Sequence, residues 1–291
     1  SSSSAGSSSS VEPLVYVERL DAPTSREPCT LGGVRDLAER WLKSIPTLRE
    51  PQLRVALVTN DWATEELDVV AEALEHVALL AEQADPRARE VLAAATPCLG
   101  DPSSELRVDA LREEARTRGF LALERLLRRR PAPGLSSPDP SQRGAADLRA
   151  GRALTLGERK ALARRQDRYT LDRLLRDPHP HVIRALLANP RVTEDDVVRL
   201  AAKRPTYGDV QVEIAKTPRW SIQARVRLAL VQNPYTPPAV SVPLLGLLVR
   251  SELLQVAQAT DVPAVVRAGA LELLERRPPV PSSDDEPSPQ Q

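Results

Sequence analysis

A nine-residue motif, V-x-x-x-L-x-x-N-P, constrains the fold of this chain more than any other feature of its sequence. Complete copies span residues 182–190 and 226–234, 44 positions apart. Apolar residues four apart lie on one face of a helix, and proline ends a helix because it cannot donate a backbone hydrogen bond and it displaces the preceding residue from helical geometry. Each copy therefore predicts a short amphipathic helix that ends in a sharp corner.

The motif also occurs in weaker forms along the chain. Residues 210–218 end in Thr-Pro, residues 253–261 in Thr-Asp and residues 53–61 in Asn-Asp. Thr64 and Thr193 each follow an asparagine by four positions, and the acidic residues after them favour a helix N-terminus at both threonines. A helix, a corner and a second helix, repeated at roughly 40 to 44 residues, predict an α-solenoid.

With these motifs the chain resembles HEAT-like repeat proteins and, less closely, leucine-rich-repeat-variant proteins. The resemblance covers about 155–277 and extends faintly over 31–130. It implies an all-α fold, an α-solenoid of HEAT-like helical repeats in one or two segments, with disordered termini. Solenoids serve as scaffolds, as nucleic-acid binders and occasionally as enzymes, so the resemblance indicates an architecture and not an activity.

Composition divides the chain into five parts. These are an extended or disordered arm (1–30), a helical domain with degenerate repeats (31–130), a linker rich in Pro, Gly and Ser (131–146), a HEAT-like repeat domain (147–277) and a disordered acidic tail (278–291). The β-branched stretch 11–20 is either a short strand or part of the extended arm.

Helical periodicity predicts where the individual helices lie. In the first domain we expect them at 31–45, 53–58, from Thr64 to about 83, from 85 to Thr96-Pro97, and over 104–130 with Gly119 as a weak point. In the second we expect them at 155–166, 169–176, 180–188, 194–204, 208–216, 221–232, 237–249, 251–259 and 263–276.

Basic residues are concentrated in the repeat domain. The formal net charge of the chain is zero, but residues 147–277 hold 22 basic and 14 acidic side chains, a net charge of +8. The other two segments carry −5 (1–146) and −3 (278–291). This distribution predicts either an anionic ligand for the repeat domain or screening by the acidic segments.

Six arginines at spacings of three and four are candidate partner-binding or anion-binding residues: Arg164, Arg165, Arg168, Arg173, Arg176 and Arg184. They form either a surface that grips phosphates or carboxylates, or a solvated face paired with the alternating Asp167, Asp172 and Asp177. Asn189 and Asn233 either present their amides to a ligand or end helices at corners. Trp220, with Tyr207 and Tyr235, either stacks on bases or packs at corners.

Metal and cofactor chemistry have little support in the sequence. Asp177, His179 and His181 form the one group with metal-ligand character, but a third separated ligand is missing and the adjoining prolines indicate a turn, so we expect no metal and no cofactor. Motifs for nucleotide binding, serine hydrolysis and zinc proteolysis are missing. The one enzyme class left open is that of DNA glycosylases of HEAT-like fold, for which Trp220, an aspartate such as Asp209 and the arginine cluster would have to supply the site.

The remaining features favour a bacterial cytoplasmic protein. Arginine far outnumbers lysine, which is typical of a GC-rich bacterial genome, and Cys29 and Cys98 lie in no metal-ligand spacing, which indicates a reducing compartment. No apolar run approaches the ~18 residues that span a bilayer. We therefore expect a non-enzymatic scaffold for protein–protein interaction, with a protein or peptide partner, no membrane partner and an open oligomeric state. A nucleic-acid-binding protein that uses the arginine-rich repeats, including a glycosylase-like repair role, is the alternative.

Overall fold

The computed structural model describes residues 31–129 and 154–277, which belong to one compact unit, Leu31–Gln291. Within these ranges every regular element is a helix and there is no strand, so the all-α prediction is confirmed. The predictions for the arm (1–30), for the linker (131–146) and for the tail (278–291) fall outside the described residues, and so does the alternative strand at 11–20.

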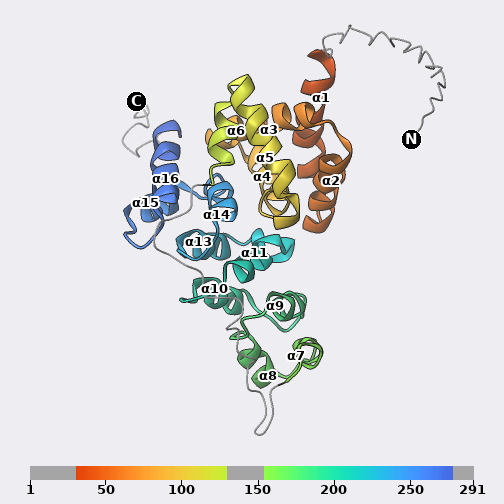
Figure 1. Cartoon of the computed structure of the whole chain (residues 1–291), viewed down its shortest axis with the longest axis vertical. Helices are drawn as coiled ribbons and strands as arrows, with labels where there is room; N and C mark the ends of the chain where they lie inside the picture. Colours follow the sequence, from red (N-terminus) through yellow and green to blue (C-terminus); the bar gives the residue numbers. More distant parts are fainter. Residues whose placement is uncertain (1–30, 130–153, 278–291) are drawn as a thin grey trace, which may run out of the picture. The chain divides into compact units, whose positions relative to one another are not determined.

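Six α-helices precede the linker (Figure 1): α1 (Leu31–Ser44), α2 (Pro51–Thr64), α3 (Leu67–Glu82), α4 (Pro86–Leu99), α5 (Glu105–Arg118) and α6 (Leu121–Leu126), with 3-10 turns η1 (Ile45–Thr47) and η2 (Pro102–Ser104). The apolar helix α3 packs against α1, α4, α5 and α6. Trp41 is fully buried, and its indole N–H donates to Asp61 over 2.8 Å. This tryptophan is thus a core residue.

Two predicted helix ends near the degenerate motif copy are wrong. Helix α2 continues through Asn60-Asp61 because Asp61, unlike proline, keeps its backbone N–H, and because Asp61 and Trp62 are buried against the core. Thr64 is consequently the last residue of α2 instead of an N-cap, and its hydroxyl donates to the Asn60 carbonyl over 3.0 Å. Helix α3 starts after Glu66.

Two further boundaries differ from prediction. The expected helix over 104–130 is divided into α5 and α6 because Gly119 adopts a left-handed conformation, with φ of 69°, and ends α5 there. Helix α4, in contrast, passes its expected end at Thr96-Pro97 and continues to Leu99. Residues 96–99 are all buried, so tertiary packing holds the helical turn that proline weakens.

Ten helices follow the linker within the described residues: α7 (Leu156–Ala163), α8 (Arg168–Leu174), α9 (Pro180–Leu187), α10 (Glu194–Ala202), α11 (Gly208–Lys216), α12 (Pro218–Ser221), α13 (Ala224–Gln232), α14 (Pro238–Leu245), α15 (Arg250–Gln258) and α16 (Ala264–Arg276). Every helix predicted in this part is present, and the short α12 is additional. Thr193 caps α10 as expected, in a capping box with Asp196.

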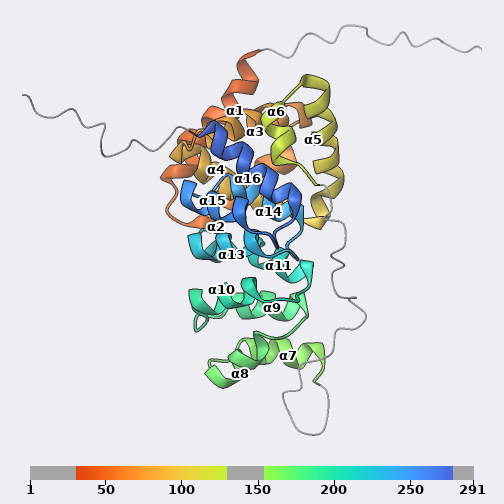
Figure 2. The same ribbon diagram turned by 90° about the vertical axis from the view of Figure 1, so that its left-hand side faces the viewer.

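These helices pack in sequence order along two rows. Helix α9 contacts both α7 and α11, while α10 contacts α13 (Figure 2). The apolar motif residues Val182, Leu186, Val226 and Leu230 are fully buried, as predicted. Helix α4 contacts α11 and α14, so the helices on both sides of the linker share one compact unit. The proposed division into two domains stays a prediction.

Candidate functional site

Two clefts lie between the helices that carry the candidate arginines. The first, which we call the basic cleft, has a volume of about 460 Å³, and its basic lining consists of Lys160 from α7 and Arg164 from the C-cap of α7, with His181 and Arg184 from α9. The second, the mixed cleft, has a volume of about 530 Å³ and lies between α8 and α10. Its charged lining consists of Asp172, Arg176, Asp196, Arg199 and Lys203.

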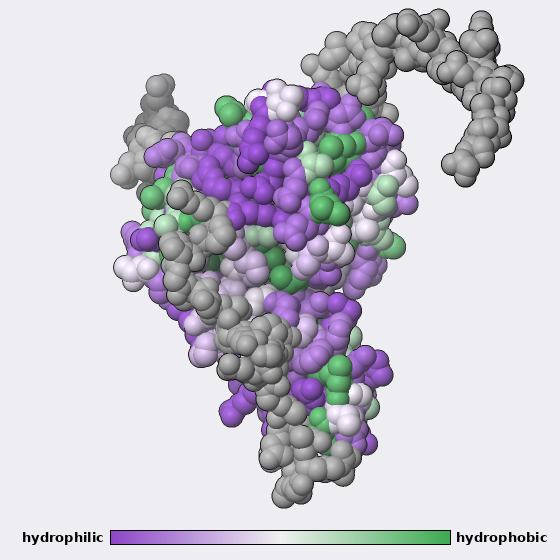
Figure 3. Space-filling model, viewed as in Figure 1, coloured by the Kyte–Doolittle hydropathy of each residue, from purple (hydrophilic) through white to green (hydrophobic). Residues whose placement is uncertain are grey.

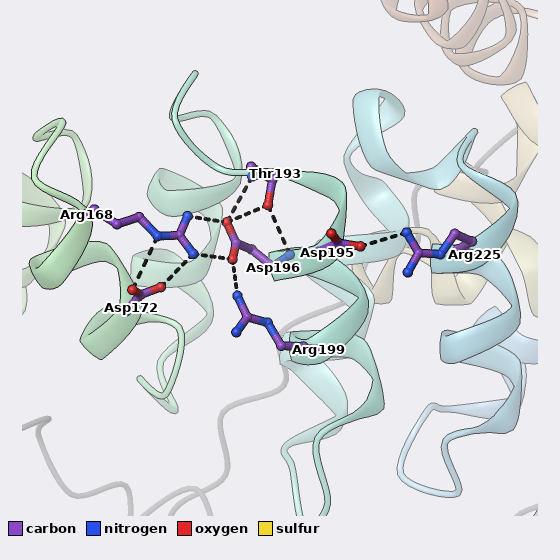
Figure 4. Close-up of polar contacts among 7 residues, drawn as sticks. All are labelled: Arg168, Asp172, Thr193, Asp195, Asp196, Arg199 and Arg225. Atoms are coloured by element: carbon purple, nitrogen blue, oxygen red, sulfur yellow. Dashed lines mark hydrogen bonds and ion pairs between the residues drawn. The ribbon is translucent and has the colours of Figure 1, made fainter.

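Asp196, which lines the mixed cleft, forms an ion pair with a neighbouring helix. The guanidinium of Arg168 donates two hydrogen bonds of 2.6 Å to the carboxylate of Asp196, whose side chain is only 1% exposed (Figure 4). Asp196 also accepts from the backbone and hydroxyl of Thr193, in the capping box of α10. The hydrogen bonds from Arg168 hold the pKa of the Asp196 carboxyl well below its usual range. The guanidinium of Arg168 is therefore engaged by a carboxylate of the same chain.

Further pairs extend this charge compensation to neighbouring helices. Asp172 lies within 2.7 Å of Arg168 on the same helix, and Asp195 of α10 forms a 2.7 Å ion pair with Arg225 of α13 (Figure 4). The alternation of arginine and aspartate expected from the sequence is thus present at Arg168 and Asp172. Asp177 instead pairs with Arg159, over 2.7 Å, at a buried position.

The basic cleft holds cations that the fold leaves uncompensated. Among the described residues no hydrogen bond or ion pair engages the side chain of Lys160 or of Arg164. Arg184 donates from Nε and Nη2 to Glu213 of α11, each over 2.7 Å, and its Nη1 has no bond to another described residue. Both walls of the cleft therefore present N–H donors to solvent.

The two motif asparagines occupy equivalent internal positions. The amide of Asn189 donates to the carbonyls of Ala163 and Arg165 over 2.8 and 2.7 Å, and the amide of Asn233 donates to those of Ala201 and Lys203 over 2.6 and 2.9 Å. Each side-chain oxygen accepts the N–H two residues onward. Both residues are at most 3% exposed. Their amides thus join consecutive corners and face the protein interior.

Trp220 also packs at a corner. Its side chain is buried, its indole N–H donates to the Leu187 carbonyl over 2.9 Å, and the guanidinium of Arg219 lies 4.3 Å from the ring centroid. The indole faces are therefore covered by the protein and by Arg219, which leaves little surface on which a base could stack.

The other candidate arginines are scattered. Arg165 is exposed but does not line either cleft, Arg176 lines the mixed cleft, and the guanidinium of Arg173 lies 5.7 Å from the ring of Tyr169. Only Arg164 and Arg184 of the six predicted residues line the basic cleft. The structure therefore divides the arginines between different surfaces.

The segment around His179 forms a turn. Asp177 is buried, pairs with Arg159 and accepts the backbone N–H of His179 over 2.9 Å, while the ring of His179 accepts the N–H of His181. In the part of the chain that the structure describes, no group of three or more His, Cys, Asp or Glu side chains is arranged to hold a metal ion.

Sequence reasoning missed Lys160 as a candidate. A signal for it exists, because Lys160 lies four residues before Arg164 within the predicted helix 155–166, a spacing that places two side chains on one face. The capping box of Thr155 and Glu158, which fixes the start of α7, also has the readable form T-x-x-E. The contribution of Glu213, 29 positions from Arg184, has no local signal.

Comparisons of the chain with protein-family models, with curated proteins and with solved structures found no match. Among the described residues, no helix is both long enough and apolar enough to cross a membrane.

Proposed function

We propose that this chain is a non-enzymatic, cytoplasmic scaffold, an α-solenoid of HEAT-like repeats that binds a protein or peptide partner on its surface. The repeat architecture is supported by the equivalent contacts of Asn189 and Asn233, because the same side chain joins successive corners at both copies of the motif. Stacked repeats provide a long surface without any requirement for catalytic geometry.

The observation that carries the choice of partner is that carboxylates lie among the arginines of the repeats and pair with several of them. A DNA duplex carries one charge per about 1.7 Å and is bound by a continuous set of cations. Here Arg168 and Arg225 are paired with carboxylates, and Asp172 and Asp195, which are 49% and 70% exposed, lie beside them. A long polyanion would meet these acids, whereas a protein partner can match a surface of alternating charge.

The test uses the immobilised full chain to capture protein partners. Each captured partner is purified and titrated against the chain by calorimetry. Parallel titrations use a generic DNA duplex at two ionic strengths. We expect saturable binding of a protein partner that excess duplex does not displace. Absence of any such partner, together with tight duplex binding that weakens steeply with salt, would instead support the nucleic-acid alternative.

A further inference from the structure

We propose that the basic cleft is a binding site for an acidic peptide segment, with Lys160 and Arg164 as the residues that bind its carboxylates. This inference rests on the proposed function and assigns the partner's chemistry and its site. It is carried by the cleft volume of about 460 Å³ and by the four basic side chains, two on each wall, in its lining. Ligand clefts generally measure about 300–1,000 Å³, so the volume suits a short peptide segment.

The cations of the two walls differ in what they offer a ligand. The side chains of Lys160, in α7, and of Arg164, at the C-cap of α7, have no partner among the described residues, so binding a carboxylate breaks no existing ion pair. Arg184 on the opposite wall is oriented by Glu213 through Nε and Nη2, which leaves Nη1 to donate. A guanidinium held in place in this way loses little side-chain entropy when a ligand binds.

The rest of the lining is apolar or already hydrogen-bonded. Ala185, Ala188 and Pro190 provide small apolar surfaces, and the carboxamide of Asn189 is occupied by backbone partners. Figure 3 shows a few hydrophobic residues among hydrophilic ones over α7 and α9. A peptide backbone can therefore lie on small apolar side chains while its acidic side chains reach the cations on both walls.

Charge on the neighbouring helices favours a short acidic segment over a nucleic acid. The mixed cleft, between α8 and α10, contains Asp172 and Asp196 beside the cations Arg176, Arg199 and Lys203, and Arg199 is paired with Asp196. The mixed cleft thus places carboxylates beside its cations, whereas the described lining of the basic cleft contains no carboxylate, so a purely basic lining extends over that one cleft. A segment with two or three carboxylates matches that extent, whereas a duplex extends beyond it.

The experiment measures binding of a fluorescent decaglutamate peptide to the full chain at about 0.15 M ionic strength, where the Debye length is about 8 Å. The test variant is Lys160→Ser with Arg164→Ser. The matched control is Arg87→Ser with Arg165→Ser, which removes the same charge from two exposed arginines outside the cleft. A decaglutamine peptide and a generic duplex serve as competitors, and circular dichroism on heating checks that both variants fold.

We expect at least about a tenfold loss of decaglutamate affinity in the test variant, because charge-assisted hydrogen bonds are lost, and less than about a threefold loss in the control. Equal losses in the two variants, no binding to the unaltered chain, displacement of the peptide by decaglutamine, or displacement by a duplex at the same concentration of anionic groups would overturn the proposal. If the captured protein partner binds both variants equally, the assignment of the cleft fails and the scaffold function stands. Absence of any protein partner contradicts the scaffold function itself.

Discussion

Replacement of Asn189 by alanine tests whether the corner asparagines hold successive repeats together. The side chain is 3% exposed and makes three hydrogen bonds: two from its amide to the carbonyls of Ala163 and Arg165, and one from the N–H of Arg191 to its oxygen. Alanine removes all three and leaves backbone groups near the corner without a partner.

The expected loss follows from these contacts. A hydrogen bond contributes about 0.5–1.5 kcal/mol to stability, and a buried polar group left without a partner costs about 1–3 kcal/mol. The Arg165 carbonyl and the Arg191 N–H lie in partly buried contacts, where water can replace the amide, so we expect Asn189→Ala to lower the free energy of unfolding by about 3 kcal/mol. Asn189→Asp should cost more, because a carboxylate oxygen would face two carbonyl oxygens.

The assay is urea unfolding followed by tryptophan fluorescence, to which Trp220 contributes from the adjoining corner. Asn233→Ala should give a similar loss, because Asn233 makes the equivalent three bonds. Asn60→Ala is the matched control, since Asn60 lies in the degenerate motif copy but is exposed, and it should change stability by no more than about 0.5 kcal/mol. If Asn189→Ala were as mild as Asn60→Ala, the assigned role of the corner asparagines would be wrong.

The remaining predictions use the same unfolding assay. Leu186→Ala should lower the free energy of unfolding by about 2–5 kcal/mol, because it deletes a core side chain. Leu53→Ala, at a motif position that is 54% exposed, should lower it little. Equal effects would contradict the assignment of Leu186 to the core. Gly119→Ala should destabilise by about 1 kcal/mol, since its φ is left-handed, and a neutral result would contradict this. The Asp196→Asn variant should be destabilised most above about pH 4, because the Asp196 carboxyl, whose pKa is depressed in the folded chain, stabilises the fold only while it is ionised. As the pH falls further, the difference in unfolding free energy between the variant and the unaltered chain should shrink. A difference that is constant with pH would refute the pairing.

The helices after the linker could be predicted from sequence because their determinants are local. Proline ends each motif helix, and apolar residues four apart identify its buried face, so Val182 and Leu186 were assigned correctly. The determinants at Thr64 and Pro97 are not local. There the packing of Trp62 and of residues 96–99 against the core extends a helix beyond the stop that the sequence suggests.

The candidate site was less predictable, because the partners of its arginines are distant in sequence. Asp172 could be anticipated as a partner of Arg168 from its spacing of four, but Asp196 lies 28 positions away and requires the packed structure. The sequence predicted that the six arginines share one surface. Spacings within a short stretch, however, cannot show which cleft each side chain lines. The pairing of Lys160 in α7 with Arg164 at the C-cap of α7 is, in contrast, set by local geometry.

The net charge of the repeat domain overstates the charge that it can offer to a ligand, because arginine also serves as a donor to backbone carbonyls at corners. Arg219 donates to the carbonyls of Asn189 and Val192, and Arg277, which is 6% exposed, donates to those of Gly246 and Leu248. Burial, reinforced by nearby arginines, lowers the pKa of Arg277 to about 10. An arginine held by carbonyls in this way cannot reach a phosphate or a carboxylate of a partner without exposing the carbonyls it binds. The charge available for recognition is therefore set by the cations without internal partners, which among the described residues of the candidate clefts include Lys160 and Arg164 in the basic cleft and Arg176 in the mixed cleft.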